Sequence, residues 1–315
     1  MYNTIYYICW PNYIMNLKNK IEDLWFRVYR IIGRKYIQYS KNPRPSSAPF
    51  ITGDGFRNIA QHVYDNSDTI VDPGIIRNGD IVFVGDSRIQ SFIEKIHPHI
   101  QAKYVLITHN GDASVTSEEL ARVRGKIIRW YGINMLVSDP KVVPIPIGIE
   151  NKHYYVCGIP SVFKKVIQAV VPKKDAIFYA FTVKNNPQER QPALDEIQKH
   201  PLGETLQQWR GFRAYLKHLN HFKFVISPPG SSIEGIRTWD SMYIGSVPIV
   251  KSSIPIDYFK TLGLPLLVIH DWSELKNITK ENISIIYASL KESGNREPLY
   301  IEYWIKKIEA DTKYE

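Results

Sequence analysis

Short apolar runs alternate with longer amphipathic stretches over most of this chain. The runs hold three to seven residues, a length that suits strands buried on both faces of a parallel sheet, and they lie at residues 81–84, 104–108, 135–137, 142–147, 176–182, 222–227, 247–251 and 266–270. Residues 88–96 and 118–123 have helical spacing, and Thr116 with Glu119 forms a capping box before the second of them. The alternation predicts an α/β fold with parallel sheets.

The chain divides at two places. A proline-rich stretch at residues 42–49 is typical of a linker, and a second set of strands follows residue 161. We therefore expect four parts: a basic amphipathic segment over residues 1–45, doubly wound α/β domains over 46–160 and 161–295, and a C-terminal helix over 296–315. Tyr300, Tyr303 and Trp304 are expected to dock that helix across the domains.

Composition indicates a globular chain. Of its 315 residues, 44% are hydrophobic and 12% aromatic, which is enough for one large or two medium cores. Cys9 and Cys157 are the only cysteines, so neither a disulfide framework nor a thiolate metal site is expected, and a reducing compartment fits best. The sequence has no run of 18 apolar residues and no secretory signal at its start. We expect a soluble cytoplasmic protein.

The formal net charge of +9 is concentrated near the N-terminus, where residues 1–45 hold eight basic and two acidic residues. Within residues 17–35 apolar residues recur at three- and four-residue steps, which predicts an amphipathic helix with a basic far side. Such a helix either lies on an anionic membrane surface or packs on the protein with its charges solvated. Nucleic-acid binding is not expected, because no zinc-finger spacing or aromatic RNA-binding signature accompanies the charge.

Residues 224–250 carry the most informative pattern: a strand, a Pro/Gly/Ser turn, a helix, a Gly break and a second strand. The turn leaves backbone N–H groups unpaired at a helix N-terminus, where the helix dipole adds partial positive charge. Arg237 brings a planar charged fork to the first turns, and Asp240, three residues later, is expected to accept hydrogen bonds from ribose hydroxyls. The pattern predicts a nucleoside diphosphate site; the alternative is an ordinary βαβ unit with a surface ion pair.

The same segment resembles the donor-binding motif of the exostosin-type glycosyltransferases, in which a Pro/Gly turn, an Arg and a helix hold a nucleotide sugar. Residues 178–190 resemble the strand and Arg-bearing loop that opens the donor domain of that family. The resemblance covers residues 46–270 and implies the GT-B architecture of two facing Rossmann-like domains, with a UDP-sugar as co-substrate and no other cofactor. It implies as donor-binding residues Arg190, Gly230, Ser231, Ser232, Glu234, Arg237 and Asp240, the last at a position where many relatives have Glu.

Three further stretches, at residues 108–112, 130–134 and 145–151, resemble a small exostosin-like branch that includes viral capsid-glycan xylosyltransferases. They imply xylose, or else a hexose, as the transferred sugar and an oligosaccharide or glycoprotein as the acceptor. The acceptor-side residues would be His109, Asn110, Glu150 and Asn151. Structural alternatives stay open: His109 as a partly buried core residue, Glu150 and Asn151 as caps, and Trp130 as core packing instead of a sugar-stacking ring.

No Asp-x-Asp tripeptide occurs in the sequence, although the other common glycosyltransferase architecture usually holds its donor through a metal bound by that motif. We therefore expect metal-independent transfer, with Arg190, Arg237 and the helix N-terminus contacting the diphosphate. Gly-Asp-Ser at residues 85–87 resembles the nucleophile block of one esterase group, but no Asp-x-x-His accompanies it, and Ser87 is interpreted as a helix N-cap. A catalytically silent nucleotide-sugar or glycan-binding module is a further alternative.

An inverting transfer needs one general base, a carboxylate that takes the proton of the acceptor hydroxyl. A solvent-near Asp, with a pKa of about 4, is already ionised at neutral pH. Asp112 is the predicted base because it follows the strand at 104–108 in a glycine-containing loop at the carboxyl edge of the first sheet. Asp54 and Asp86 lie in similar loops and are rivals, and shaping a turn is the alternative role for all three.

Overall fold

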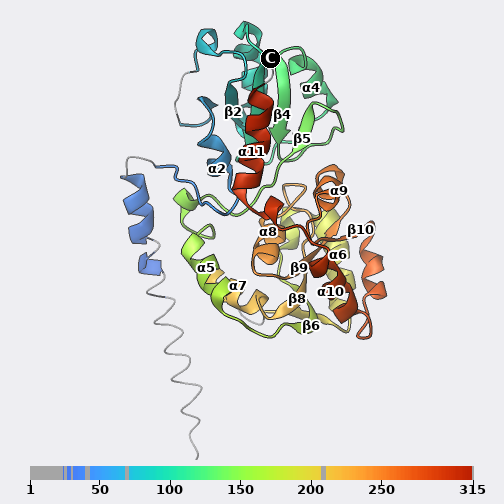
Figure 1. Cartoon of the computed structure of the whole chain (residues 1–315). Helices are drawn as coiled ribbons and strands as arrows, with labels where there is room; N and C mark the ends of the chain where they lie inside the picture. Colours follow the sequence, from blue (N-terminus) through green and yellow to red (C-terminus); the bar gives the residue numbers. More distant parts are fainter. Residues whose placement is uncertain are drawn as a thin grey trace, which may run out of the picture.

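The computed structural model describes residues 24, 27–29, 31–39, 43–67, 71–206 and 211–313. It contains two five-stranded sheets in which all strand pairs are parallel. One sheet forms before residue 160 and the other after it, and each occupies its own half of the molecule (Figure 1). The predicted α/β class with parallel sheets is confirmed, whereas the residue numbers of the domain boundaries stay a prediction.

The first sheet is built from strands with buried side chains. Its order is β1-β2-β3-β4-β5. Val82 and Val84 belong to the core on one face of the sheet, and Ile81 and Phe83 belong to the core on the other. Burial on both faces explains why the central strands are continuous apolar runs. The strand bounds are β1 (His62–Tyr64), β2 (Ile81–Gly85), β3 (Tyr104–His109), β4 (Ile127–Gly132) and β5 (Val142–Pro144).

Helices cover both faces of the first sheet. The connecting helices α3 (Ile89–Lys95) and α4 (Ser117–Val123) share one face, because a strand order without reversal places right-handed crossovers on the same side. The predicted capping box of Thr116 is present at the start of α4. The opposite face packs against α2 (Gly53–Arg57) and α11 (Ile301–Thr312), and Figure 1 shows α11 running from the second half onto this sheet.

The second sheet has the order β7-β6-β8-β9-β10. The chain moves outward from β6 to β7 and returns to the other side of β6 with β8, so the order reverses between β6 and β8. At such a reversal the segments that leave the two central strands diverge and open a crevice at their carboxyl ends. The strand bounds are β6 (Lys174–Tyr179), β7 (Gly203–Thr205), β8 (Phe222–Ile226), β9 (Val247–Lys251) and β10 (Leu267–Ile269).

Helices also cover both faces of the second sheet. One face carries α6 (Pro187–Lys199) and α10 (Ile283–Glu292). The other carries α5 (Pro160–Gln168), α7 (Phe212–Leu219), α8 (Ile236–Tyr243) and α9 (Ile254–Thr261). Short 3₁₀ helices complete the described elements: η1 (Pro73–Ile75), η2 (Asp86–Arg88), η3 (His97–His99), η4 (Lys152–Tyr154), η5 (Val183–Asn185), η6 (Trp272–Asn277) and η7 (Glu297–Leu299).

The C-terminal helix α11 joins the two halves, as the sequence predicted. The buried Trp304 ring lies 6.1 Å from the Phe259 ring of the second half. At the other end of the helix, Asp311 Oδ2 accepts a hydrogen bond from the Tyr131 hydroxyl at 2.6 Å and lies 3.0 Å from Arg129 Nε, both in β4 of the first sheet. One rigid element is therefore anchored to both sheets.

Some predicted elements differ from the structure. Residues 135–137 form no strand; Met135 makes only an isolated bridge with Val115. Strands β1, β4 and β7 were missed, because β1 and β7 are short edge strands that are not fully buried and β4 is interrupted by Arg129. Ser87 lies within η2, and the N-cap of α3 is Arg88. The predicted N-cap role of Ser87 is wrong.

The predicted N-terminal helix is seen in part. Residues 31–38 are helical, as are residues 24 and 27–29, whereas residues 17–23 lie outside the described residues. Ile37 is buried against the domain, and a Cβ atom on Gly33 would lie 2.3 Å from the Tyr155 ring. Ile31 and Ile32 are 59% and 61% exposed. Among the residues described, no helix is both long enough and apolar enough to cross a bilayer.

Candidate functional site

A cavity of about 670 Å³ opens at the carboxyl ends of β6 and β8, where the strand order of the second sheet reverses. Its walls come mainly from the segments that follow these strands, within residues 180–190 and 230–237. Asp112 and Ile147, from the loops after β3 and β5, face the cavity from the first sheet. The cavity thus lies between the two sheets, and its volume is typical of a small-molecule site.

Arg237 lies in the first turn of α8, whose N-cap Gly235 provides no side-chain cap. Gly235, Ile236 and Arg237 all line the cavity, so the uncapped start of the helix faces it. Arg237 Nη2 donates to the carbonyl of Ala180. Its Nε is buried and has no hydrogen-bond partner among the described residues. Arg237 thus brings a positive charge to the cavity wall at the start of a helix, a place that favours an anion.

Arg190 reaches the same turn from α6. Its Nε donates to the Pro229 carbonyl and its Nη1 to the Thr182 carbonyl, each at 2.8 Å. A Cβ atom on Gly230 would lie 2.5 Å from Arg190 Nη2, so a larger residue would displace the guanidinium. Burial and the charge of Arg237 hold the pKa of Arg190 below its usual value.

In the part of the chain that the structure describes, no carboxylate forms an ion pair with Arg190 or Arg237. Two guanidinium groups therefore line one cavity without an acidic partner at ion-pair distance. Because guanidinium pairs well with planar and phosphate-type oxyanions, this arrangement suits a ligand with at least two negative charges.

The other residues of the turn take different positions. Ser231 is exposed and Ser232 is buried, and both line the cavity with Gly230. Glu234 also lines it, but its oxygens accept hydrogen bonds from the Ile147 backbone N–H at 2.6 Å and from Trp239 Nε1 at 2.8 Å. Burial raises the pKa of Glu234 to about 8. Glu234 is therefore engaged in bonds within the protein, and its predicted donor contact stays a prediction.

Asp240 is buried on the inner side of α8 and is not among the residues that line the cavity. Burial raises its pKa to about 8, although nearby Arg237 acts in the opposite direction. Three residues correspond to about 300° around a helix, enough here to turn Asp240 into the core while Arg237 lines the cavity. Asp240 is thus separated from the cavity in this structure, and its predicted contact with a ribose stays a prediction.

Asp112 is exposed in the loop after β3 and faces the cavity from the first sheet. Its Oδ1 accepts a hydrogen bond from Ser232 Oγ at 2.7 Å, which joins the predicted base directly to the predicted donor turn. Of the three carboxylates considered as the base, Asp112 alone lines this cavity. The structure thus brings the sequence-predicted base and donor residues together.

Asp86, one rival for the role of base, is 3% exposed and follows β2 directly. Neither of its carboxyl oxygens has a hydrogen-bond partner in the described part of the chain. Burial, and to a smaller extent the charge of Asp112, raises the pKa of Asp86 to about 8. Asp86 does not line the cavity, so the structure gives it no position from which to meet an acceptor hydroxyl there.

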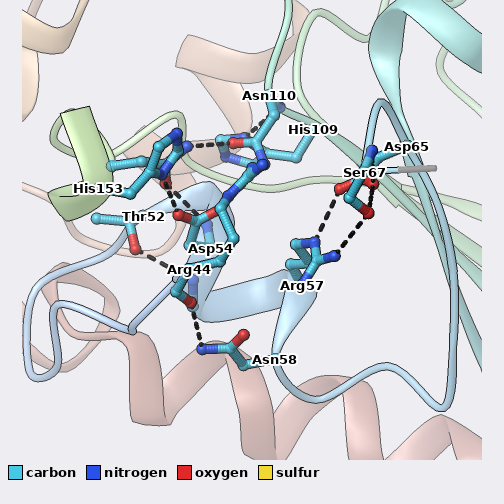
Figure 2. Close-up of polar contacts among 12 residues, drawn as sticks. Arg44, Thr52, Asp54, Arg57, Asn58, Asp65, Ser67, His109, Asn110 and His153 are labelled. Carbon is cyan, nitrogen blue, oxygen red and sulfur yellow. Dashed lines mark hydrogen bonds and ion pairs between the residues drawn. The ribbon is translucent and has the colours of Figure 1, made fainter. Parts of the chain in front are cut away.

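Asp54, the other rival, is at the centre of a buried polar network (Figure 2). Its Oδ1 lies 2.8 Å from Arg44 Nη2, and its Oδ2 lies 2.6 Å from His153 Nδ1. Its backbone N–H donates to Asn151 Oδ1 at 2.8 Å. Burial raises its pKa, but the hydrogen bonds from His153 and Arg44 outweigh this and hold the pKa below the usual value. Asp54 is therefore engaged in bonds within the protein and does not line the cavity.

The predicted acceptor residues bond to one another and to the backbone. His109 is buried; its Nδ1 accepts from the Asn110 N–H at 2.7 Å, its Nε2 donates to the Pro146 carbonyl at 3.1 Å, and burial lowers its pKa to about 4. Asn151 Nδ2 donates to Asn110 Oδ1 at 2.7 Å. Glu150 Oε2 accepts from the backbone N–H groups of residues 156–158. The cavity lining includes none of these four residues, so acceptor binding by them stays a prediction.

Two further alternatives are resolved by position. Trp130 is fully buried and donates from Nε1 to Thr108 Oγ1 at 3.0 Å, so its ring packs in the core and presents no face to a sugar. Ser87 Oγ accepts a hydrogen bond from Asn66 Nδ2 at 3.3 Å, and within the described ranges no histidine bonds to it. The esterase interpretation therefore gains no catalytic group from the structure.

The structure adds contacts to which the sequence analysis assigned no role in the site. Ile147 bonds to Glu234, and Asn134 Oδ1 accepts from the Ile233 N–H at 3.0 Å. Asn134 has φ of 54°, a left-handed conformation that Asn tolerates. Arg44 and His153 are bound to Asp54 across 10 and 99 residues of sequence, a separation that local patterns do not reveal. In the residues described, no group of three or more His, Cys, Asp or Glu is placed to hold a metal ion.

Comparison with known proteins supports the class of the chain. Residues 199–310 match the family described as the RXYLT1 C-terminal domain, a xylosyltransferase-like family of the exostosin type. This part of the chain resembles an exostosin-type glycosyltransferase. The predicted family resemblance is thereby confirmed for this part of the chain. The match includes the turn at residues 230–235 and Arg237, but neither Arg190 nor Asp112.

Two solved structures also match. The first, described as "OtsA apo structure", has 10% sequence identity and a TM-score of 0.46. The match covers 77% of this chain and 74% of the matched chain. The second, "Spinosyn Rhamnosyltransferase SpnG complexed with thymidine diphosphate", has 10% identity and a TM-score of 0.34, covering 68% of each chain. Both scores lie below 0.5, so these likenesses add nothing to the fold described above. None of the curated proteins matches the chain.

Asp86→Asn is expected to remove a pH dependence of stability. An Asp in the unfolded chain loses its proton near its ordinary pKa of 3.8, whereas folded Asp86 keeps it up to about pH 8. Between these two pH values the folded wild type binds one proton more than the unfolded chain at this carboxyl. The free energy of unfolding therefore falls as pH rises, by up to about 1.4 kcal/mol per pH unit. Chemical denaturation of both proteins at pH 5 and pH 8.5 measures the effect. Asp86→Asn should gain stability relative to the wild type at the higher pH, and an unchanged difference would contradict the prediction.

Proposed function

We propose that this protein is an inverting, metal-independent glycosyltransferase that moves xylose or a hexose from a UDP-sugar to a hydroxyl of a glycan. The observation that carries the proposal is the composition of one cavity. Two guanidinium groups without acidic partners line it from the second sheet, and an exposed carboxylate faces them from the first sheet. A diphosphate binder and a proton acceptor are the two groups that such a transfer requires. The match to the RXYLT1 family favours xylose.

The second sheet would hold the nucleoside diphosphate. Arg190 and Arg237 supply positive charge, and the uncapped start of α8 supplies backbone N–H donors on the same wall of the cavity. The Gly230 position lets the Arg190 guanidinium approach the turn closely. These groups would also stabilise the negative charge that develops on the diphosphate as it leaves, which is the task that a cation performs in metal-dependent enzymes.

The first sheet would supply the base. Asp112 takes the proton of the acceptor hydroxyl while that oxygen forms a bond to the anomeric carbon of the sugar. The bond from that carbon to the diphosphate oxygen breaks on the opposite face, and the electron pair leaves with the diphosphate. Charge is balanced, because one carboxylate is neutralised and one diphosphate oxygen gains the negative charge.

We also propose that the N-terminal helix contacts an anionic membrane surface on the cytoplasmic side. Leu24, Ile31 and Ile32 are large apolar residues with exposed side chains, and Arg34 and Lys35 beside them are exposed as well. An exposed apolar stripe flanked by basic residues fits an interface of lipid tails and anionic headgroups. The alternative is that the helix packs its apolar side on the protein. That explains why Ile37 is buried, but it does not explain why Leu24, Ile31 and Ile32 are exposed.

Arg237→Ala is expected to weaken UDP binding about 10- to 150-fold, because a charge-assisted hydrogen bond to phosphate contributes about 1.5 to 3 kcal/mol. Titration calorimetry with UDP measures the change. Arg122→Ala, a variant of an exposed arginine on α4, is the matched control and should bind UDP as the wild type does. Wild-type affinity in Arg237→Ala would remove the donor-site assignment.

Transfer activity is expected to persist in excess EDTA, because Arg190, Arg237 and the α8 N-terminus supply the positive charge at the diphosphate. The measurement is the rate of UDP release from a UDP-sugar with and without the chelator. A loss of turnover that Mn²⁺ or Mg²⁺ restores would show that a metal is required.

Asp112→Asn is expected to lower turnover about a hundredfold or more while UDP affinity stays close to that of the wild type. The amide keeps the shape of the side chain and still accepts a hydrogen bond from Ser232, but it takes no proton. UDP affinity and transfer rate are measured on one preparation. Near-normal turnover would show that Asp112 only shapes its loop, and a wild type that binds UDP-sugars without slow hydrolysis would indicate a binding module.

The double variant Ile31→Ser/Ile32→Ser is expected to lose most binding to vesicles that contain phosphatidylserine, because it removes apolar area that would enter the interface. Co-sedimentation with such vesicles, and with neutral phosphatidylcholine vesicles, measures binding. Ile285→Ser is the matched control, since Ile285 is 69% exposed on α10. Equal sedimentation of the double variant and the wild type would refute the membrane contact.

A further inference from the structure

Three consecutive residues of the second half bond to the ends of three adjacent strands of the first sheet. Ser232 Oγ donates to Asp112 in the loop after β3 at 2.7 Å. The Ile233 N–H donates to Asn134 Oδ1, after β4, at 3.0 Å. Glu234 Oε1 accepts from the Ile147 N–H, after β5, at 2.6 Å. Because β3, β4 and β5 are neighbours in the sheet, residues 232–234 run across its carboxyl edge; we name them the coupling segment.

The bonds of the coupling segment are partly buried, and most of the side chains that make them are buried. Ser232, Glu234 and Asn134 are 7%, 3% and 1% exposed. Breaking a buried hydrogen bond leaves groups without the compensation that water gives at a surface. The coupling segment therefore shifts relative to the first sheet only at a cost, and the two are expected to move together.

The coupling segment is also continuous with the proposed donor site. Glu234 Oε2 accepts from Trp239 Nε1 at 2.8 Å, and Trp239 lies on α8, the helix that carries Arg237. On the other side the segment continues the turn at Gly230, where the Asn186 side chain donates to the Gly230 carbonyl at 3.0 Å. A ligand that orders this turn and the start of α8 thus orders the residues that touch the first sheet.

The loop that carries Asp112 is fixed from its other side by Asp86. A Cβ atom on Gly111 would lie 2.6 Å from the Asp86 Cβ, so the two segments are in close contact. The Asp112 loop thus contacts Asp86 through Gly111 and Ser232 through the Asp112 carboxylate. Small displacements of the coupling segment are expected to change the direction of the Asp112 carboxylate, because nothing else in the described residues hydrogen-bonds to that group.

We propose that the coupling segment transmits occupancy of the donor site to Asp112, and that Asn134 and Glu234 are positioning residues for the transfer. The inference rests on the proposed function, since it assumes that the turn at 230–235 binds the diphosphate. Donor binding would then fix the base before the acceptor arrives. A base that is held within about 0.5 Å of its productive place matters strongly for rate.

Hydrogen exchange of the full chain, read by mass spectrometry with and without UDP, tests the coupling. In the wild type UDP should protect peptides that contain residues 230–236 and also peptides that contain residues 109–115, although the latter belong to the other half. In Asn134→Gly, which keeps the left-handed backbone, UDP should protect only residues 230–236. Its UDP affinity should stay within about threefold of the wild type while kcat falls about tenfold or more.

Two further variants separate positioning from folding. Asn134→Asp keeps both the left-handed backbone and an oxygen that accepts from the Ile233 N–H, so it should retain the protection of residues 109–115. Asn277→Gly, at an exposed position at the end of η6, is the control for replacing an asparagine with glycine and should behave as the wild type.

The outcomes distinguish the two proposals. If UDP protects residues 230–236 of the wild type and leaves residues 109–115 unprotected, the coupling is refuted and the donor site stands. Protection of both regions in Asn134→Gly, with wild-type kcat, refutes the coupling as well. If UDP binds the wild type nowhere, the donor site is refuted and the coupling with it.

Discussion

The hydrogen bonds between residues 232–234 and the carboxyl edge of the first sheet are the contact on which the rest of the site depends. A parallel sheet presents the functional ends of all its strands at one edge, but each sheet here supplies only part of a chemical site. The second sheet provides cations and the first provides a carboxylate. Only when the two edges are held against one another do Arg190, Arg237 and Asp112 line a single cavity.

Bringing these groups together lowers the stability of the folded state, because it buries acidic side chains and places like charges near one another. Asp86, Glu234 and Asp240 are buried acids whose pKa values are raised to about 8, and an acid with a raised pKa lowers the stability of the folded state above its ordinary pKa. Arg190 and Arg237 carry like charges near one another, and no carboxylate of the described residues lies at ion-pair distance from either. Groups of this kind gather at functional sites because an anionic ligand offsets the repulsion there.

The central strands and the donor turn could be predicted because their signals are local. The runs at 81–84, 104–108 and 247–251 are buried on both faces, so each is apolar throughout. The turn before α8 is recognisable from its Pro, Gly and Ser residues. Edge strands such as β1 and β7 gave no comparable signal, since residues that are only partly buried need not be apolar.

The site was harder to predict than the fold because its partners are distant in sequence. Asp112 and Ser232 are 120 residues apart, and Asp54 and His153 are 99 residues apart. The sequence identified Asp54, Asp86 and Asp112 as loop acids beside glycine and favoured Asp112 from its place after a central strand; burial and ion pairing, which are tertiary properties, distinguish the three further. For Asp240 the local pattern was misleading. Its spacing from Arg237 suggested that both side chains lie on one face of α8, but Asp240 is buried in the core.

Helix α11 limits how far the two halves can separate. Its Trp304 packs against Phe259 of the second half, and its Asp311 bonds to Tyr131 and Arg129 of the first sheet. A helix is stiff over this length, so a wide opening would either expose the buried Trp304 ring or break the bonds of Asp311 to Tyr131 and Arg129. The frame of the two sheets is therefore expected to stay closed while the turn at residues 230–235 and the Asp112 loop make the smaller adjustments that ligand binding requires. Coupling of the donor site to Asp112 through the three bonds of the coupling segment is compatible with two sheets that stay closed. A small displacement of residues 232–234 is enough to move the Asp112 carboxylate, and no rotation of one domain against the other is needed.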